Sequence, residues 1–167
     1  FPTRPHVVEA AAAAVRDGAT RYTASLGIEP LRAAIAAHYR ERHAAAVGAE
    51  DVVVTVGASG ALTIAFGLFV NPGDEVILAD PTYPSNRAFV SLFGGTPTLV
   101  PVGAAERFQL TPELVERHWT PRTRGVLVAS PANPTGTTIA PDALRGIHEV
   151  VRRRGGVLVV DEIYHEL

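Results

Sequence analysis

The stretch RGVLVASPANPTG, residues 124–136, runs from a β-branched apolar segment directly into a loop that holds two prolines, an asparagine and a glycine. An ordinary turn needs only one proline or one glycine, so this combination indicates a backbone held in one shape to aim a side chain. Asn133 is the side chain in that position. The same order, an apolar run followed by a loop with polar residues, recurs elsewhere in the chain.

Five short apolar runs alternate with helix-length segments from residue 51 onward. Because they are apolar on both faces, they are typical of a mainly parallel sheet that is covered by helices. We therefore expect an α/β fold with three layers, α/β/α, preceded by two helices at residues 6–18 and 29–45. The expected strands are DVVVTV (51–56), EVILA (75–79), TPTLVPV (96–102), RGVLVA (124–129) and GVLVV (156–160).

The composition narrows the class of protein. The 167 residues, 47% of them hydrophobic, are enough for one compact domain, and no linker or repeat divides residues 1–167. A net charge of -2 gives no general attraction to nucleic acid or to anionic membranes, and no apolar stretch approaches a membrane span. The absence of cysteine removes thiolate metal sites and favours a cytoplasmic location. His38 and His43 are five positions apart and do not share a helix face closely, so no metal site is expected.

All fifteen basic residues are arginines, and the sequence contains no lysine. Arginine forms no Schiff base and is not deprotonated in proteins, so these residues offer no amine nucleophile. The opening FPTRPH lacks an initiator methionine and a signal core, and we expect further sequence upstream of it.

Ligands of parallel sheets bind beyond the carboxyl ends of the strands, so the loops there carry the candidate site. GASG, at 57–60, opens a helix with small residues, where free backbone N–H groups form an anion site. Gly57, Ala58 and Ser59 could hold a phosphate. The alternative is a close-packed turn in which Ser59 serves as the helix N-cap.

Two further motifs at strand ends each allow a functional and a structural interpretation. Tyr83 stands between two prolines in DPTYP, which would hold its flat ring rigidly beside a ligand. The alternative is a turn in which the Tyr83 ring packs on the rim. Asp161 and Tyr164 lie in DEIY, after a strand buried on both faces. A carboxylate there either caps the next helix or stabilises a cationic ring nitrogen, since a nearby opposite charge favours the protonated form.

The motifs RYTASLG, LRAAIA, GASGAL, DPTYP, NPTG and DEIYHEL, in this order and at these separations, resemble the class I/II aminotransferases, pyridoxal-phosphate enzymes of fold type I. The resemblance covers essentially all of residues 1–167 and implies the amino-terminal part of the large, cofactor-binding domain. In the family, the Schiff-base lysine, an arginine for the substrate carboxylate and the small domain follow the DEIY motif. We therefore expect no catalytic residue within this chain and no activity from these residues alone.

The resemblance implies an enzyme of amino acid metabolism or biosynthesis, which transfers an amino group between an amino acid and a 2-oxo acid. Relatives with the same cofactor cradle are decarboxylases or C–S lyases, and others are sensor domains of transcription regulators. These remain alternatives at this point. Neither nucleic acid nor a membrane is expected as a partner.

The resemblance also assigns residues to parts of the cofactor. It places the phosphate at Ala58 and Ser59, with Gly57 allowing close backbone approach, and it stacks Tyr83 on the pyridine ring. Tyr22 matches a tyrosine that reaches the cofactor phosphate of a partner subunit, so a homodimer is implied.

Three residues are assigned to the polar atoms of the ring. Asn133 would hydrogen-bond the ring hydroxyl oxygen and help to seat the substrate carboxylate, which accounts for the stiff loop around it. Asp161 would pair with the protonated ring nitrogen, and Tyr164 would donate to the ring hydroxyl oxygen.

The family also implies details of the backbone. The peptide bonds Asp80–Pro81 and Asn133–Pro134 are expected to be cis. The sheet is expected to hold TPTLVPV, EVILA, RGVLVA and GVLVV as neighbours in that order, with DVVVTV paired to a strand outside these residues.

Overall fold

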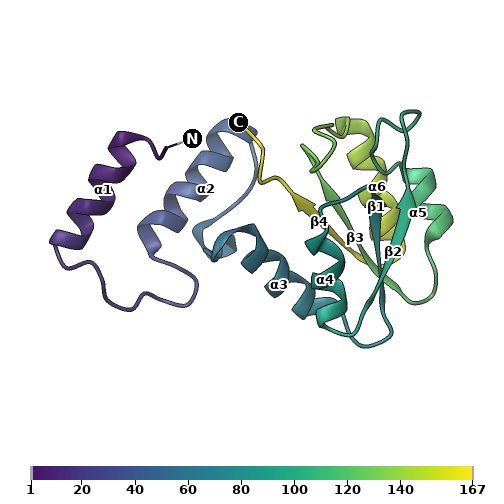
Figure 1. The fold of residues 1–167 in the computed structure, drawn as a ribbon, viewed down its shortest axis with the longest axis horizontal. Coiled ribbons are helices and arrows are strands. Elements are labelled where there is room, and N and C mark those ends of the chain that lie inside the picture. The colour runs from purple at the N-terminus through teal and green to yellow at the C-terminus, as the bar shows by residue number, and fades with distance from the viewer. Residues whose placement is uncertain (1, 167) are drawn as a thin grey trace. The chain divides into compact units, whose positions relative to one another are not determined.

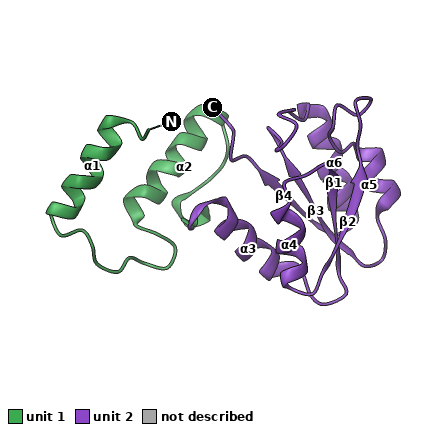
Figure 2. Ribbon diagram, in the orientation of Figure 1, with its two compact units in different colours: residues 1–55 green, residues 56–167 purple. Residues whose placement is uncertain are grey.

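The computed structural model describes residues 2–166 of the chain (Figure 1). The chain forms two compact units, residues 1–55 and residues 56–167 (Figure 2). None of the helices in the described residues combines the length and the apolar character that crossing a membrane requires.

A parallel sheet of four strands forms the centre of the second unit. Its order is β2-β1-β3-β4, which confirms the predicted order of neighbours. All four strands begin and end within two residues of their predicted positions. The strands are β1 (Glu75–Asp80), β2 (Thr96–Pro101), β3 (Thr123–Ala129) and β4 (Val157–Asp161).

Helices cover both faces of the sheet, so the three-layer α/β/α fold is confirmed (Figure 1). The alternation of side chains along β1 builds a core on each face, because Val76 and Leu78 pack in one cluster and Ile77 packs in the other. One face carries α3 (Gly57–Phe69) and α4 (Ser85–Leu92), and the other carries α5 (Pro112–His118) and α6 (Pro141–Arg153).

The first unit holds α1 (Pro5–Arg16), α2 (Glu29–His43) and the short 3₁₀ turn η1 (Ala49–Asp51). Both helices carry a proline in their first turn, where the missing N–H breaks no intrahelical bond. The two predicted helices are therefore confirmed, and Ala44, the C-cap of α2, takes the left-handed conformation with φ 51°.

Residues 51–56 do not form the strand that their β-branched composition predicted. Val52 has extended backbone angles, but a strand also needs a neighbour to complete its hydrogen-bond ladder. The segment bonds within its own unit instead, because Arg32 Nε donates to the Val52 carbonyl at 2.9 Å and Val54 N–H donates to the Leu26 carbonyl at 3.0 Å. Its predicted pairing with a strand outside these residues stays a prediction.

The two predicted cis peptide bonds, Asp80–Pro81 and Asn133–Pro134, are confirmed. A third cis bond, Ser130–Pro131, was not predicted. The loop after β3 therefore contains two of the three cis bonds found in the described residues.

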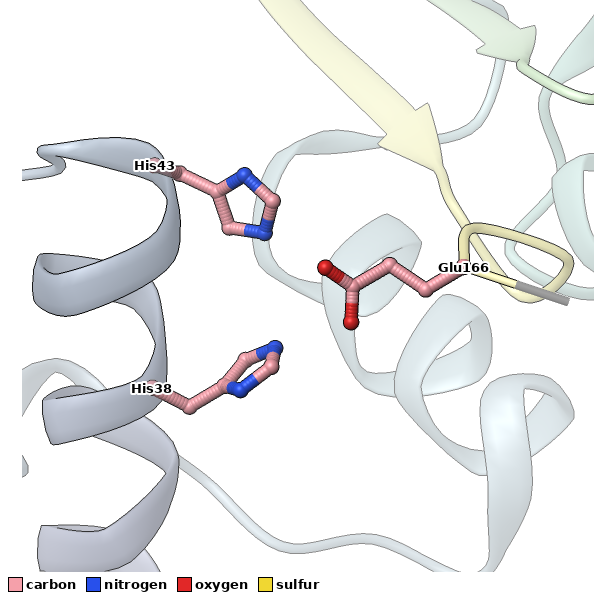
Figure 3. A group of neighbouring side chains, drawn as sticks. All are labelled: His38, His43 and Glu166. Carbon is pink, nitrogen blue, oxygen red and sulfur yellow. The ribbon is translucent and has the colours of Figure 1, made fainter.

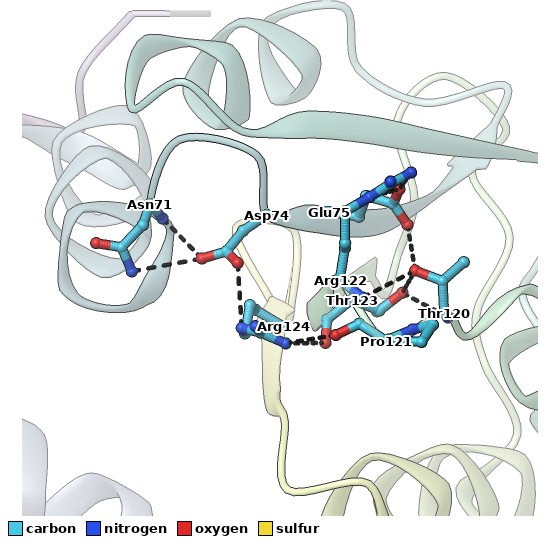
Figure 4. A network of polar contacts seen from close by, with 8 residues as sticks. All are labelled: Asn71, Asp74, Glu75, Thr120, Pro121, Arg122, Thr123 and Arg124. Carbon is cyan, nitrogen blue, oxygen red and sulfur yellow. Dashed lines mark hydrogen bonds and ion pairs between the residues drawn. The ribbon is translucent and has the colours of Figure 1, made fainter.

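Polar side chains join the amino-terminal ends of β1 and β3 (Figure 4). Glu75 is buried, accepts hydrogen bonds from Thr120 Oγ1 at 2.6 Å and from Arg122 Nε at 2.8 Å, and has its pKa lowered by these contacts. Its neighbour Asp74 pairs with Arg124 Nε at 3.1 Å. These contacts hold two adjacent strands together at the end of the sheet opposite to the strand-end loops that carry the candidate site.

Candidate active site

A cavity of about 320 Å³ lies where β1, β3 and β4 end and α3 begins. The chain passes from β1 to β2 on one side and returns to β3 on the other, and ligands of open α/β sheets bind at such a reversal of strand order. The cavity is lined by seven predicted residues, Gly57, Ala58, Ser59, Tyr83, Asn133, Asp161 and Tyr164, and by Leu62, Asn86, Phe89, Ala129, Pro131 and Ile163.

Tyr22 is the eighth predicted site residue, and it belongs to the first unit. Its side chain is fully exposed. It is not among the residues that line the cavity.

The start of α3 contributes backbone groups to the cavity. Val56 is the N-cap and no side chain caps the helix, so Ser59 is the third helical residue and not the N-cap of the alternative interpretation. The first N–H groups of a helix have no intrahelical acceptor, and the helix dipole makes this end attractive to an anion. Gly57 has φ 68°, and a Cβ added there would meet no atom within 4 Å, so its backbone borders open space.

The loop of residues 130–137 closes on itself through backbone hydrogen bonds. Ala132 N–H donates to the Thr137 carbonyl at 2.9 Å, and Gly136 N–H donates to the Ala132 carbonyl at 2.7 Å. Asn133 lies within this closed turn and contributes to the cavity wall. The rigid loop that the two prolines predicted is therefore built from internal bonds as well as from proline rings.

Asp161 ends β4 and contributes a carboxylate to the cavity wall. Its Oδ1 accepts a hydrogen bond from Ile163 N–H at 3.0 Å, which orients the carboxylate at the start of a turn. Residues 163–166 form a turn after it. The Asp161 carbonyl accepts from Ser130 N–H at 3.0 Å and ties the loop after β3 to β4.

Asn86 is a cavity residue that sequence reasoning missed. Its side chain is 2% exposed, and Nδ2 donates to Thr82 Oγ1 at 3.0 Å, while Oδ1 is buried without a hydrogen-bond partner. The signal was present in the helical spacing, because Asn86 precedes the buried Val90 by four positions and so places an amide on the apolar face of α4.

Two histidines of the first unit lie closer together than their spacing predicted. The rings of His38 and His43 contact each other edge to face, with centroids 5.8 Å apart, and Figure 3 shows both rings projecting from α2. Glu166, which is also labelled there, belongs to the second unit.

Comparison with known proteins identifies the family. A family model described as aminotransferase class I and II matches residues 1–167. The chain belongs to this family. This match confirms the resemblance seen in the motifs. The class I and II aminotransferases are pyridoxal-phosphate enzymes.

Individual aminotransferases resemble the chain in sequence and in structure. It is 40% identical to a probable aspartate/prephenate aminotransferase of Thermus aquaticus over 100% of its own length, and 42% identical to a valine–pyruvate aminotransferase of Mycobacterium tuberculosis over 95%. The aspartate aminotransferase of Thermus thermophilus, solved with maleate, superposes with a TM-score of 0.93 at 38% identity over 97% of the chain. The chain spans only 44%, 40% and 42% of these three aminotransferases, respectively.

The groups on the cavity wall are of the kinds that can bind pyridoxal phosphate. Backbone N–H groups at the start of α3 suit a phosphate, and the Asp161 carboxylate suits a protonated ring nitrogen. The open space beside Gly57 leaves room for the phosphate to approach the backbone. The orphaned Oδ1 of Asn86 beside the cavity is a further sign that this wall is built for a polar ligand, because buried polar atoms in native proteins are usually paired.

Proposed function

We propose that this chain provides the cofactor cradle of a pyridoxal-phosphate-dependent aminotransferase, which transfers an amino group between an amino acid and a 2-oxo acid. The observation that carries the proposal is the convergence of seven motif residues from four separate segments on one cavity of about 320 Å³. Aminotransferases that cover the full length of the chain support the same activity. The relatives reported above are named as aminotransferases, so the decarboxylase, lyase and regulator alternatives gain no support.

The start of α3 would bind the cofactor phosphate. Ala58 and Ser59 present their N–H groups in the first turn, and Gly57 lets the phosphate oxygens approach the backbone. Tyr83, held between two prolines, would place its ring against the pyridine ring. Together, the start of α3 would hold the phosphate and Tyr83 would supply an aromatic contact to the ring.

The other groups would act on the edge of the ring. When bound, the cofactor supplies an electron sink for the bond that is broken at the substrate Cα. Asp161 would hold a proton on the ring nitrogen, because a neighbouring carboxylate favours the protonated form. Asn133 and Tyr164 would donate hydrogen bonds to the ring hydroxyl oxygen, and Asn133 would also help to seat the substrate carboxylate. Within these 167 residues no side chain offers an amine.

We also propose that the enzyme is a homodimer in the cytoplasm. The fully exposed ring of Tyr22 supports the dimer, since an aromatic side chain in that state is available to a second subunit. The lack of cysteine is consistent with a reducing compartment. Sedimentation of the intact protein tests the dimer, and fractionation of cells tests the location.

The experiment that tests the proposed function compares Asp161→Ala with the matched control Glu162→Gln in the intact protein. We expect the wild type to bind pyridoxal phosphate, with a visible absorbance band that an amino acid substrate shifts in a half-reaction. A nearby carboxylate moves a pKa by about 1–3 units, so Asp161→Ala should slow the half-reaction at least about tenfold. Glu162 is exposed and does not line the cavity, so Glu162→Gln should leave the rate unchanged. A wild type without cofactor binding, or equal rates in the two variants, would refute the proposal.

A further inference from the structure

Gln109 contacts both ends of the loop that carries Asn133. Its side-chain Nε2 donates to the Ala129 carbonyl at 3.3 Å, where β3 ends, and to the Thr137 carbonyl at 2.8 Å, on the far side of the loop. The same nitrogen lies 3.1 Å from Thr137 Oγ1. Both carbonyl oxygens can only accept, so they fix which end of the amide faces the loop.

The contact is long-range and buried. Gln109 is 7% exposed and lies 20 and 28 residues from its two partners along the chain. Replacing this buried amide is costly because the hydrogen bonds to both carbonyls are lost, although the Thr137 carbonyl still accepts from Ala132 N–H. No feature of the sequence identified this residue, since a single glutamine in a loop has no characteristic spacing.

The loop that carries Gln109 is itself held rigidly. Gly103 N–H donates to Glu106 Oε2 at 2.9 Å, and Phe108 N–H donates to the Gly103 carbonyl at 2.8 Å. The flanking residues Val102 and Leu110 are both buried in the core. Gln109 is therefore anchored to the core on both sides and is able to fix a second loop.

The space between Gln109 and Asn133 leaves little room for rearrangement. Both residues line a hollow of only about 10 Å³, which is at the lower limit for one water molecule. A site residue on a loop keeps its geometry only when supporting contacts restrict the loop. If the amide of Gln109 were lost, the loop would still be tied to β4 through Ser130 N–H, but it would lose its connection to the loop at 103–110, and its internal bonds would open more often.

We propose that Gln109 is a positioning residue that sets the location of Asn133 in the cofactor cavity. It acts by joining the two ends of the 130–137 loop to the rigid loop at 103–110. The proposal deepens the proposed function and rests on it, because Asn133 is there the donor to the ring hydroxyl oxygen and to the substrate carboxylate. Gln109 itself does not line the cavity.

Two variants and one control test the positioning role in the intact protein. Gln109→Leu keeps most of the volume and removes the donor, and Gln109→Glu keeps the shape and replaces the donor by an acceptor. The control is Thr123→Val, because Thr123 is equally buried and hydrogen-bonded but lies in the network at the opposite end of the sheet. Either Gln109 variant suffices if the other fails to fold.

The first readout is hydrogen exchange of the loop without ligand. The N–H groups of Ala132 and Gly136 should exchange at least about fivefold faster in the Gln109 variants and at the wild-type rate in Thr123→Val. Unchanged exchange in the Gln109 variants would refute the proposal that Gln109 restricts the loop, whether or not the protein binds pyridoxal phosphate.

The second readout is the affinity for pyridoxal phosphate and the pH midpoint of its absorbance band. Gln109→Leu should weaken binding about fivefold or more and raise the midpoint, and Asn133→Ala should do the same, because the first displaces and the second removes a donor to the ring oxygen. In the Asn133→Ala background, Gln109→Leu should add less than about twofold, since its effect passes through Asn133.

Full additivity of the two substitutions, or a lowered melting temperature with unchanged affinity and midpoint, would overturn the positioning role. A wild type that binds no pyridoxal phosphate would instead refute the proposed function and the cofactor part of this inference. The exchange rates would still show whether Gln109 restricts the 130–137 loop.

Discussion

Arg122 holds Glu75 by two hydrogen bonds to one carboxylate oxygen, from Nε at 2.8 Å and from Nη2 at 2.5 Å (Figure 4). The other oxygen of Glu75 accepts from Thr120. Glu75 is the first residue of β1, and its two partners lie just before β3, so these bonds join the starts of two adjacent strands. The Arg122 guanidinium is mostly exposed, whereas the Glu75 carboxylate is buried. The buried carboxylate therefore depends on these hydrogen bonds more than the guanidinium does.

Stability in acid should depend on Glu75. Hydrogen bonds from Thr120 and Arg122 lower its pKa below the ordinary value of 4.5, so the folded state favours the carboxylate. The resulting stability is fully present above the unfolded pKa and is lost as the pH falls through the lowered, folded value. Glu75→Gln should therefore cost about 1–2 kcal/mol at pH 7 and show a shallower loss of stability below about pH 4.5.

Urea unfolding measured between pH 7 and pH 3 checks this prediction. Asp142→Asn is the control, because the pair between Asp142 and Arg145 is exposed on α6. An acid profile of Glu75→Gln that runs parallel to that of the wild type would contradict the assignment.

Close packing at Gly125 should not tolerate a methyl group. A Cβ at this position in β3 would lie 2.8 Å from the Val157 carbonyl and 2.8 Å from the Phe69 ring, and the carbonyl belongs to the adjacent strand. Gly125→Ala should therefore destabilise the fold by about 1–3 kcal/mol through overpacking. At Gly103 the nearest atom would be 3.6 Å away, so Gly103→Ala should be close to neutral. Thermal unfolding of the two variants side by side measures the difference, and equal melting temperatures would be inconsistent with this packing.

The strands and their order could be predicted because the signals were local or carried by the family resemblance. The apolar runs at β1 to β4 are long enough to stand out, and each ends in a loop with proline or acidic residues. The failure at residues 51–56 shows the limit of such signals. Val52 there has extended backbone angles, but a strand requires a partner, and composition contains no information about partners.

The cavity could be predicted only in part, for a related reason. Tyr83, Asn133 and Asp161 lie within four residues of the end of an apolar run, so their place at the carboxyl edge of the sheet follows from the topology. Asn86 and Gln109 reach their positions through tertiary contacts, one on the inner face of a helix and one in a loop that follows β2. Long-range contacts of this kind leave no periodic pattern in the sequence.

The unpaired amide oxygen of Asn86 should make that position tolerant of an apolar isostere. Asn86→Leu removes a buried carbonyl oxygen that has no partner, together with one hydrogen bond to Thr82. An unsatisfied buried group costs about 1–3 kcal/mol and one hydrogen bond contributes about 0.5–1.5 kcal/mol, so the ligand-free protein should be as stable as the wild type or more stable. Asn86→Ala should be less stable than Asn86→Leu, because it leaves a void. Urea unfolding without cofactor measures both, and a loss of more than about 2 kcal/mol in Asn86→Leu would mean that Oδ1 has a partner in solution.

A polypeptide of these 167 residues should bind pyridoxal phosphate without forming a covalent bond to any side chain, because it contains fifteen arginines and no lysine. Borohydride reduction followed by digestion and mass spectrometry should find no pyridoxyl group except at the α-amine of Phe1. Arg145→Lys provides a positive control, because it places one amine at an exposed site on α6 and shows whether the assay detects an accessible lysine.

Noncovalent binding should persist, since the start of α3 and Asp161 both border the cavity, and it should weaken in Asp161→Asn. A pyridoxyl adduct on an internal side chain of the unmodified polypeptide, or amino transfer above the background of free cofactor, would show that the chemistry needs no lysine from outside these residues.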